Sequence, residues 1–408
     1  MKDRRLWIIF FIIFVNFLGF GIILPLLPYY VESLGAGALA IGLLLSTYSL
    51  FQLLSAPILG ELSDRFGRRP VLLFSLGGTV ISFALMGFAN TLFLLFLARI
   101  IDGASGGNIS TAQAYIADIT NKKSRTQGMG MMMAAISLGF ILGPAIGGLL
   151  SVYGYSVPAF VAAAVALIAM ILTYFFLPES FRPVVRTAAQ TAAARRKRIF
   201  RLKDFYDALT HPNIGLFSTI SFMMMLAFSL MQGTFALFTE HTLHFTAETN
   251  GLIFAYLGIV GVLVQILLLP KILKKIPENL VIIFSLTSMA LSLFIIAFAS
   301  SMSALIVAVT FLALGNGVSG PVIAGTISKP TPDDEQGNIA GMNQSVGSMA
   351  RLTGPLIGTF LYSQLGVRSP YLIATGILLL TVLYTARKLK KTHSRSGQFF
   401  ARANLKTK

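Results

Sequence analysis

The stretch GELSDRFGRR, residues 60–69, decides the fold because it interrupts a chain that otherwise avoids charge. Its charged residues are Glu61, Asp64, Arg65, Arg68 and Arg69. The segments on either side, 33–60 and 70–98, contain no Asp, Glu, Lys or Arg. Each is longer than the roughly 20 residues that an α-helix needs to cross the hydrocarbon core of a bilayer. The sequence therefore predicts a short charged loop between two membrane-spanning helices.

The composition of the whole chain agrees with that interpretation. Of its 408 residues, 55% are hydrophobic and only 12% are charged, and the mean hydropathy is +0.78. A soluble domain carries about twice that charged fraction. The composition predicts an all-α polytopic membrane protein. There are no cysteines, which excludes disulfides and thiolate metal sites, and we expect neither a metal nor a cofactor.

Turn and charge signals divide the apolar sequence into twelve segments long enough to span a membrane. We expect twelve transmembrane helices near residues 7–30, 39–60, 70–89, 91–115, 127–150, 157–177, 213–238, 249–270, 279–299, 302–325, 338–363 and 369–387.

The distribution of positive charge predicts the orientation. All but three of the 32 Lys and Arg fall at the chain ends or in the connections from even-numbered to odd-numbered spans, the exceptions being Arg99, Arg351 and Arg368. Basic connections mark the cytoplasmic side of a membrane protein. Both termini are therefore expected in the cytoplasm. The same rule accounts for the basic run ARRKRIFRLK near residue 200, so we do not expect a nucleic-acid partner.

Two halves of the chain resemble each other. DGASGG and GPAIGG in the first half match NGVSGP and GPLIGT in the second, and a long basic connection separates the two halves. Paired six-helix bundles are typical of transporters, which rock about a site near the middle of the membrane. We predict two pseudo-symmetric bundles at 1–178 and 213–387, a basic cytoplasmic linker at 179–212 and a basic cytoplasmic tail at 388–408.

The opening loop resembles a motif of a known family. Its residues follow the G-x-L-x-D-R-x-G-R-R/K loop of the major facilitator superfamily at Gly60, Leu62, Asp64, Arg65, Gly67, Arg68 and Arg69. The resemblance implies a cytoplasmic gate in which Asp64 faces the opposite half of the protein, at the start of the eleventh span near Gly337. There the positive end of a helix dipole would stabilise the carboxylate. The arginines are expected to pair with Asp118.

Further motifs resemble one branch of that family, the twelve-helix drug/proton antiporters with the tetracycline-type exporters. The fifth span reads GFILGPAIGGLL, which is similar to the antiporter motif at Gly139, Gly143, Pro144, Gly147 and Gly148. The fourth span has Arg99 and Gly103 of an R-x-x-x-G motif, and the first span has Pro25 and Pro28 as in those exporters. The resemblance covers nearly the whole chain.

The charges inside the spans are the candidates for proton coupling. Many tetracycline-type exporters have an aspartate in the first span, where this chain has Asn16. Asp102 instead lies one helical turn from Arg99, on the same face of the fourth span. A charge inside a membrane is costly, so such a pair is either functional or a structural ion pair. Arg351 is the other intramembrane charge, and the sequence leaves open whether it lines the cavity, binds an anion or stabilises a closed state.

The resemblance implies a secondary active exporter of hydrophobic or amphipathic drugs that exchanges them for protons, not an enzyme, working as a monomer in a bacterial cytoplasmic membrane. Two alternatives remain: a major facilitator carrier for a sugar, nucleoside or small anion, and a membrane-embedded lipid-modifying enzyme. EHTLH at 240–244 is interpreted as a polar outer cap rather than a metal site. Polarity and depth suggest these substrate-cavity residues, together with Arg351: Asn16, Tyr48, Gln52, Gln113, Gln232, Tyr256, Asn316, Asn343 and Gln344.

Overall fold

The computed structural model describes residues 4–180, 202–211, 214–329, 331 and 336–405. Helices are the only regular secondary structure in these ranges. The helices of the first half are α1 (Arg4–Ser33), α2 (Ala38–Phe66), α3 (Arg68–Gly87), α4 (Leu92–Ser105), the 3₁₀ turn η1 (Gly106–Asn108), α5 (Ile109–Ile119), α6 (Lys122–Ser151) and α7 (Ser156–Phe176).

The second half is helical in the same way. Its helices are α9 (Leu202–Thr210), α10 (Gly215–Leu243), α11 (Ala247–Leu263), the π-helical segment η2 (Val264–Leu268), α12 (Leu269–Leu273), α13 (Glu278–Phe298), α14 (Met302–Ser328), α15 (Gln336–Leu365) and α16 (Ser369–Leu405). Most of the expected linker at 179–212 lies outside the described residues.

Each of the twelve expected spans corresponds to a helix or to a broken helix. Eleven of the spans in the described chain are long and apolar enough to cross a membrane. The eleventh expected span, α15, is 30 residues long but is not among them. Its sequence carries Asn343, Gln344, Ser348 and Arg351, and these polar side chains lower its hydropathy. The polarity of α15 suits a helix that faces protein or water rather than lipid.

Two of the spans are broken. The fourth span consists of α4, η1 and α5, so its α-helical hydrogen bonding is interrupted at Gly106–Asn108. The eighth consists of α11, η2 and α12. Interruptions of this kind often mark a hinge or a functional position within a helix. The break in the fourth span follows Asp102 by four residues.

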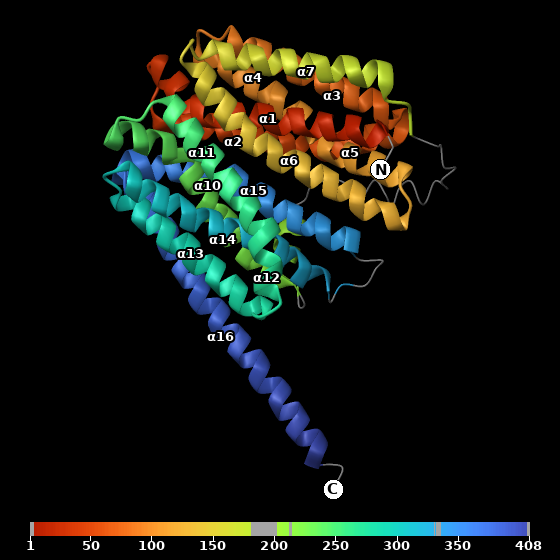
Figure 1. Cartoon of the computed structure of the whole chain (residues 1–408), viewed down its shortest axis with the longest axis vertical. Helices are drawn as coiled ribbons and strands as arrows, with labels where there is room; N and C mark the ends of the chain where they lie inside the picture. Colours follow the sequence, from red (N-terminus) through yellow and green to blue (C-terminus); the bar gives the residue numbers. More distant parts are fainter. Residues whose placement is uncertain (1–3, 181–201, 212–213, 330, 332–335, 406–408) are drawn as a thin grey trace. The chain divides into compact units, whose positions relative to one another are not determined.

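The described chain forms two compact units. The first contains the N-terminal helices together with residues 232–259 and 351–367, which are parts of α10, α11 and α15. In this unit α1 lies alongside α6 and also packs on α7 (Figure 1). Its interior is filled by apolar side chains such as Ile12, Leu76, Tyr115 and Ala166, all essentially inaccessible.

The second unit contains the remaining parts of the C-terminal helices. Here α13 packs on both α14 and α16. Ser288 of α13 donates a hydrogen bond to the carbonyl of Phe311 in α14 at 2.6 Å, and Thr375 of α16 donates to the carbonyl of Ala290 at 3.4 Å. Helix α16 continues to Leu405 (Figure 1), so the expected basic tail after residue 387 is helical over most of its length.

Candidate functional site

A buried ion pair lies in α4, as the spacing of its residues predicts. Nη1 of Arg99 is 3.1 Å from Oδ2 of Asp102. Arg99 is 0% exposed and Asp102 is 5% exposed. Residues three apart on a helix face the same way, which is why the pair forms within one turn. Burial removes both charges from water, so each depends on the other for its stabilisation.

Tyr48 of α2 lies against this pair. The guanidinium carbon of Arg99 is 4.5 Å from the centre of the Tyr48 ring, which is a cation–π contact. Tyr48 was expected among the cavity residues, but its contact with Arg99 was not predicted.

Small and polar residues hold α2 against the fourth span. A side-chain carbon added at Gly103 would lie 2.5 Å from the Tyr48 carbonyl oxygen, so only glycine permits this approach. Gln52 donates hydrogen bonds to the Tyr48 hydroxyl at 2.9 Å and to the Gly106 carbonyl at 3.2 Å. Ser55 donates to the carbonyl of Gly103 at 3.2 Å. Tyr48 is therefore fixed beside the ion pair.

The asparagine that replaces the expected aspartate of the first span has its own partner. Asn16 donates a hydrogen bond to Oδ1 of Asn108 at 2.8 Å, and Asn108 is fully buried at the end of η1. This contact joins α1 to the break in the fourth span. Asn108 was not among the expected site residues, because a single asparagine in an apolar segment gives no signal by itself.

The other expected cavity residues are divided between the two units. Gln113, Gln232 and Tyr256 are half-buried in the first unit. Three more belong to the second unit, where Asn316 and Gln344 are exposed and Asn343 is half-buried.

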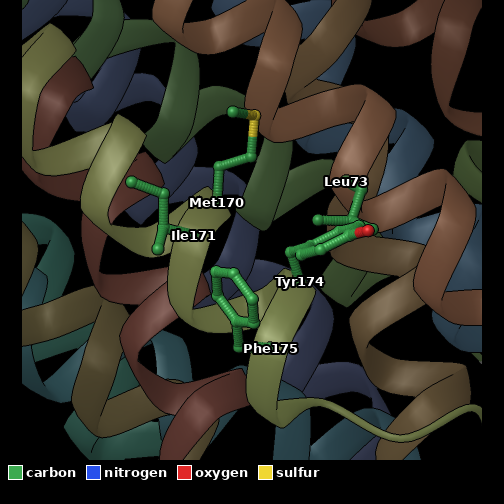
Figure 2. A pocket seen from close by; sticks show the side chains of 5 residues that line it. All are labelled: Leu73, Met170, Ile171, Tyr174 and Phe175. Carbon is green, nitrogen blue, oxygen red and sulfur yellow. The ribbon is translucent and has the colours of Figure 1, made fainter.

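An apolar groove of about 340 Å³ lies between α3 and α7 (Figure 2). It is lined by Leu73, Met170, Ile171, Tyr174 and Phe175, none of which carries a charge. None of the expected cavity residues lines it. The groove therefore has no titratable carboxylate or base for proton coupling.

The charged loop at 60–69 forms a compact network in which Arg68 is central. Arg68 bonds to Asp64, one turn earlier, and its Nε lies 3.1 Å from Oδ2 of Asp118. The structure thus brings Arg68 and Asp118 together, as the resemblance implied. That Asp64 faces the start of α15 remains a prediction. Arg65 is exposed, and a side-chain carbon added at Gly60 would make ordinary contact with the Ser110 hydroxyl at 3.7 Å.

Gly67 in this loop has a structural reason to be glycine. Its φ is 103°, a conformation that side chains disfavour, and an added Cβ would lie 2.9 Å from the carboxyl carbon of Glu179. Glu179 accepts hydrogen bonds from the backbone amides of Arg68 at 2.9 Å and Arg69 at 3.1 Å. A carboxylate at the N-terminus of α3 stabilises the free amides there.

The antiporter motif of the fifth span packs α6 against two helices. Added side-chain carbons at Gly139, Gly143 and Gly147 would lie 2.5–2.7 Å from atoms of α1. At Gly148 the nearest atoms belong to α11, including Gly251 at 3.0 Å. Such close helix contacts require small residues. The motif therefore holds α1, α6 and α11 together.

A second titratable cluster lies where α1 ends. Nε2 of His241 in α10 is 3.3 Å from Oε1 of Glu32 in α1. Nδ1 of His241 is 2.8 Å from the hydroxyl of Tyr362 in α15. Residues 240–244 were predicted to form a polar cap, and the contacts of His241 with Glu32 and Tyr362 were not predicted. In the described ranges no acidic or histidine side chains are grouped as metal ligands would be.

Comparisons with known proteins agree with this geometry. The family model described as Major Facilitator Superfamily matches residues 9–280 and 271–406. The chain is similar to Multidrug resistance protein 2 of Bacillus subtilis, with 31% identity over 92% of this chain and 94% of the relative. It is also similar to the class C tetracycline resistance protein of Escherichia coli, with 32% identity over 89% of this chain and 90% of the relative.

Solved structures with the same fold are also found. The crystal structure of the human organic anion transporter MFSD10 matches with a TM-score of 0.68 and 24% identity, over 94% of this chain and all of the other. At that identity the match supports the fold alone.

Proposed function

The chain belongs to the major facilitator superfamily, and on that premise we propose that it exports hydrophobic or amphipathic drugs in exchange for protons. Members of this family are transporters and not enzymes, so the expectation that the chain is not an enzyme is confirmed, and the lipid-modifying alternative is excluded. The names of its multidrug and tetracycline resistance relatives support drug efflux. The names of these relatives do not mention protons, so proton exchange needs separate support.

The observation that supports proton exchange is the buried ion pair of Arg99 and Asp102. Within the described spans, Asp102 is the only acidic side chain that is buried well inside the helix rather than near its end. Placing a carboxylate at that position in the membrane costs about 2.5–3.5 kcal/mol on insertion scales. This cost favours a functional role for Asp102 over a purely passive one. A carboxyl group that is alternately ionised and neutral can carry a proton across.

The proposed cycle links the charge of Asp102 to the conformation of the protein. With Asp102 ionised and paired with Arg99, the inward-facing protein accepts a drug from the cytoplasm or the inner leaflet. After the drug leaves on the outside, Asp102 takes a proton, and its neutralisation weakens its hold on Arg99. Exchange requires the two states to differ in proton affinity, because otherwise protonation shifts no equilibrium.

Tyr48 gives Arg99 a second partner when Asp102 is neutral. The guanidinium of Arg99 lies over the Tyr48 ring at 4.5 Å, and this cation–π contact does not depend on the charge of Asp102. We infer that Tyr48 holds Arg99 in the span during the return step.

The organisation of the chain belongs to the same proposal. Two related six-helix halves, cytoplasmic termini, a monomeric state and a bacterial membrane fit a transporter of this branch. The repeated glycines support related halves: Gly103 of the fourth span closely approaches α2, and an added carbon at Gly317 of α14 would lie 2.8 Å from the Gly261 carbonyl in α11. The second and fourth spans of each half would thus pack alike.

The test is proton movement in proteoliposomes that hold purified protein and an internal pH dye. Adding tetracyclines or lipophilic cations should produce a proton flux with the wild type. Asp102→Asn should reduce this drug-linked flux at least about tenfold, since coupling free energies of 1–3 kcal/mol correspond to 5- to 150-fold effects.

Asp207→Asn is the matched control, because it makes the same chemical change in α9, outside the spans, and should leave the flux unchanged. A drug-linked flux that survives Asp102→Asn would contradict Asp102 as the proton carrier. If no drug on the panel produced any flux, the drug exporter would be contradicted and the metabolite carrier favoured.

A further inference from the structure

The apolar groove between α3 and α7 opens to the outside of the helices (Figure 2). Three of its five lining residues, Ile171, Tyr174 and Phe175 of α7, are 44%, 58% and 68% exposed. Both α3 and α7 are long and apolar enough to cross a membrane. Apolar side chains that are exposed on such a span face the hydrocarbon of the bilayer. The groove is therefore a hollow in the lipid-facing surface, and the proton cycle proposed for Asp102 does not use it.

A glycine of α3 keeps this hollow open. Gly77 lies one turn beyond Leu73, and a carbon added at Gly77 would lie 3.7 Å from Sδ of Met170, in ordinary contact. Residues four apart lie on the same face of a helix, so Leu73 and Gly77 share a face of α3, and Met170 and Tyr174 share a face of α7. The groove therefore follows the line along which the two helices meet, which suits an extended apolar chain.

Arg69 of α3 places a positive charge at one end of the groove. It precedes Leu73 by four residues, so the two side chains lie on the same face of α3. The guanidinium carbon of Arg69 is 5.5 Å from the centre of the Tyr174 ring, and its Nη2 donates a hydrogen bond to the Tyr174 carbonyl. The cation is therefore in contact with a residue that lines the groove.

The Arg69 guanidinium retains donors for a further partner. An arginine has five N–H donors, and the bond to the Tyr174 carbonyl uses one of them. In the described ranges Nε of Arg69 has no acceptor, and no carboxylate is paired with the guanidinium. Glu179 instead accepts from the backbone amide of Arg69, at 3.1 Å. Since a guanidinium matches the oxygens of a carboxylate or a phosphate, an anion of that kind would complete this end of the groove.

The order of charge and apolar surface along α3 is that of a phospholipid. A helix rises about 1.5 Å per residue, so Arg69 lies about 6 Å from Leu73 along the axis, on the side of the loop 60–69. That loop is predicted to face the cytoplasm. A phospholipid likewise carries its phosphate at the membrane surface and its acyl chains deeper in the bilayer. A lipophilic cation would be repelled by Arg69, so the charge of this site favours an anionic lipid over a cationic drug.

We propose that the groove between α3 and α7 binds an anionic phospholipid of the cytoplasmic leaflet, with an acyl chain in the groove and the phosphate on the Arg69 guanidinium. The headgroup of phosphatidylglycerol has a net negative charge, which Arg69 attracts. In phosphatidylcholine a quaternary ammonium balances the phosphate, so the attraction is weaker. The groove thus supplies apolar contact to any acyl chain, and Arg69 selects the headgroup.

The bound lipid joins the charged loop to α7. Arg69 directly follows Arg68, the centre of the network that includes Asp64 and Asp118. A phosphate on Arg69, with its acyl chain against Tyr174, contacts the start of α3 and the end of α7 at once. The inference is independent of drug export and of proton exchange, because the lipid site contains neither Asp102 nor any of the expected cavity residues.

The test measures tryptophan fluorescence, which brominated acyl chains quench on contact. The chain has one tryptophan, so Trp7→Phe combined with Phe175→Trp places the only reporter in the groove. The full chain is reconstituted in equal mixtures of phosphatidylglycerol and phosphatidylcholine, with bromine on the chains of one lipid or the other. The quenching should show that phosphatidylglycerol binds about fivefold more tightly, as expected for one basic residue near an anionic headgroup. Arg69→Gln should reduce this ratio to about one, while the backbone bond from residue 69 to Glu179 remains.

Three further variants make the outcome decisive. Phe74→Trp, in place of Phe175→Trp, puts the reporter on a side chain of α3 that is 71% exposed and does not line the groove, and it should show no preference between the lipids. Arg65→Gln removes an exposed charge from the same loop and should retain the fivefold ratio, and Arg69→Lys should retain part of it. Equal binding of the two lipids at Phe175→Trp, or an unchanged ratio in Arg69→Gln, would overturn the lipid site. Relief of the quenching by added tetraphenylphosphonium would assign the groove to a lipophilic cation and would overturn it as well.

Discussion

At the start of α3 two carboxylates flank one guanidinium, whereas at the end of α1 one imidazole lies between a carboxylate and a tyrosine hydroxyl. The first cluster consists of Asp64, Asp118 and Arg68 and comes from the first 120 residues. The second consists of Glu32, His241 and Tyr362 and joins residues more than 100 positions apart. The pairing of Arg68 with Asp64 can be expected from its spacing within one helical turn, whereas no spacing indicates the second cluster.

This difference suggests different roles for the two clusters. Arg68 bonds to carboxylates from neighbouring segments of the chain, so its cluster fixes the loop. Glu32, His241 and Tyr362 come from α1, α10 and α15, so their contacts hold the ends of three helices together. We therefore expect substitutions in the two clusters to differ in their effect on stability.

The largest effect is expected for Arg68→Gln. This change leaves Asp64 and Asp118 close together without the guanidinium between them. Removing one partner of a buried charged network costs about 1–3 kcal/mol or more, and Arg68 is only 9% exposed. The midpoint of thermal unfolding in detergent should fall by several degrees, and drug transport should fall by about tenfold or more.

Arg65→Gln is the matched control for this change. Arg65 lies in the same loop but is exposed and rests over the ring of Phe66 at 5.1 Å. Arg65→Gln should change the free energy of unfolding by less than about 0.5 kcal/mol, so the unfolding midpoint should stay close to that of the wild type. Equal effects of the two substitutions would show that the loop depends on total charge and not on the Arg68 contacts.

A smaller effect on stability is expected for Asp64→Asn. Arg68 keeps Asp118 at 3.1 Å and the Ser63 hydroxyl at 2.7 Å, so the loop retains most of its hydrogen bonds. If Asp64 also acts as a gate against the other half of the protein, transport should still fall by about tenfold while expression is unchanged, as for the loss of a 1–2 kcal/mol contact. Transport at the wild-type level would remove the gate and leave a structural loop.

The same contrast explains what could be predicted from the sequence. Arg68 and Asp64, or Arg99 and Asp102, lie within one helical turn, so their spacing alone indicates that they can pair. Apolar runs of fixed length likewise predict the spans, because the bilayer sets that length. Contacts made within one helix or one loop are visible in the sequence.

The contacts that were missed join distant segments. Glu32 is an isolated polar residue near the end of an apolar run and His241 lies in the polar stretch 240–244, but nothing in either segment indicates that they meet. The contacts of Arg99 with Tyr48 and of Asn16 with Asn108 depend in the same way on how helices pack. The break at Gly106–Asn108 was also missed, since a glycine pair in an apolar span fits helix packing equally well. These features need a three-dimensional structure.

The smallest effect is expected for Tyr362→Phe, which removes one hydroxyl from the contacts at the end of α1. Nδ1 of His241 loses its partner at 2.8 Å and the Leu237 carbonyl loses one at 3.3 Å, whereas His241 keeps Glu32. A single hydrogen bond contributes about 0.5–1.5 kcal/mol, so the midpoint of thermal unfolding should fall by only a few degrees. Tyr153→Phe, at an exposed tyrosine before α7, should leave the midpoint unchanged. An unchanged midpoint for Tyr362→Phe as well would show that the ends of these helices do not depend on this hydroxyl.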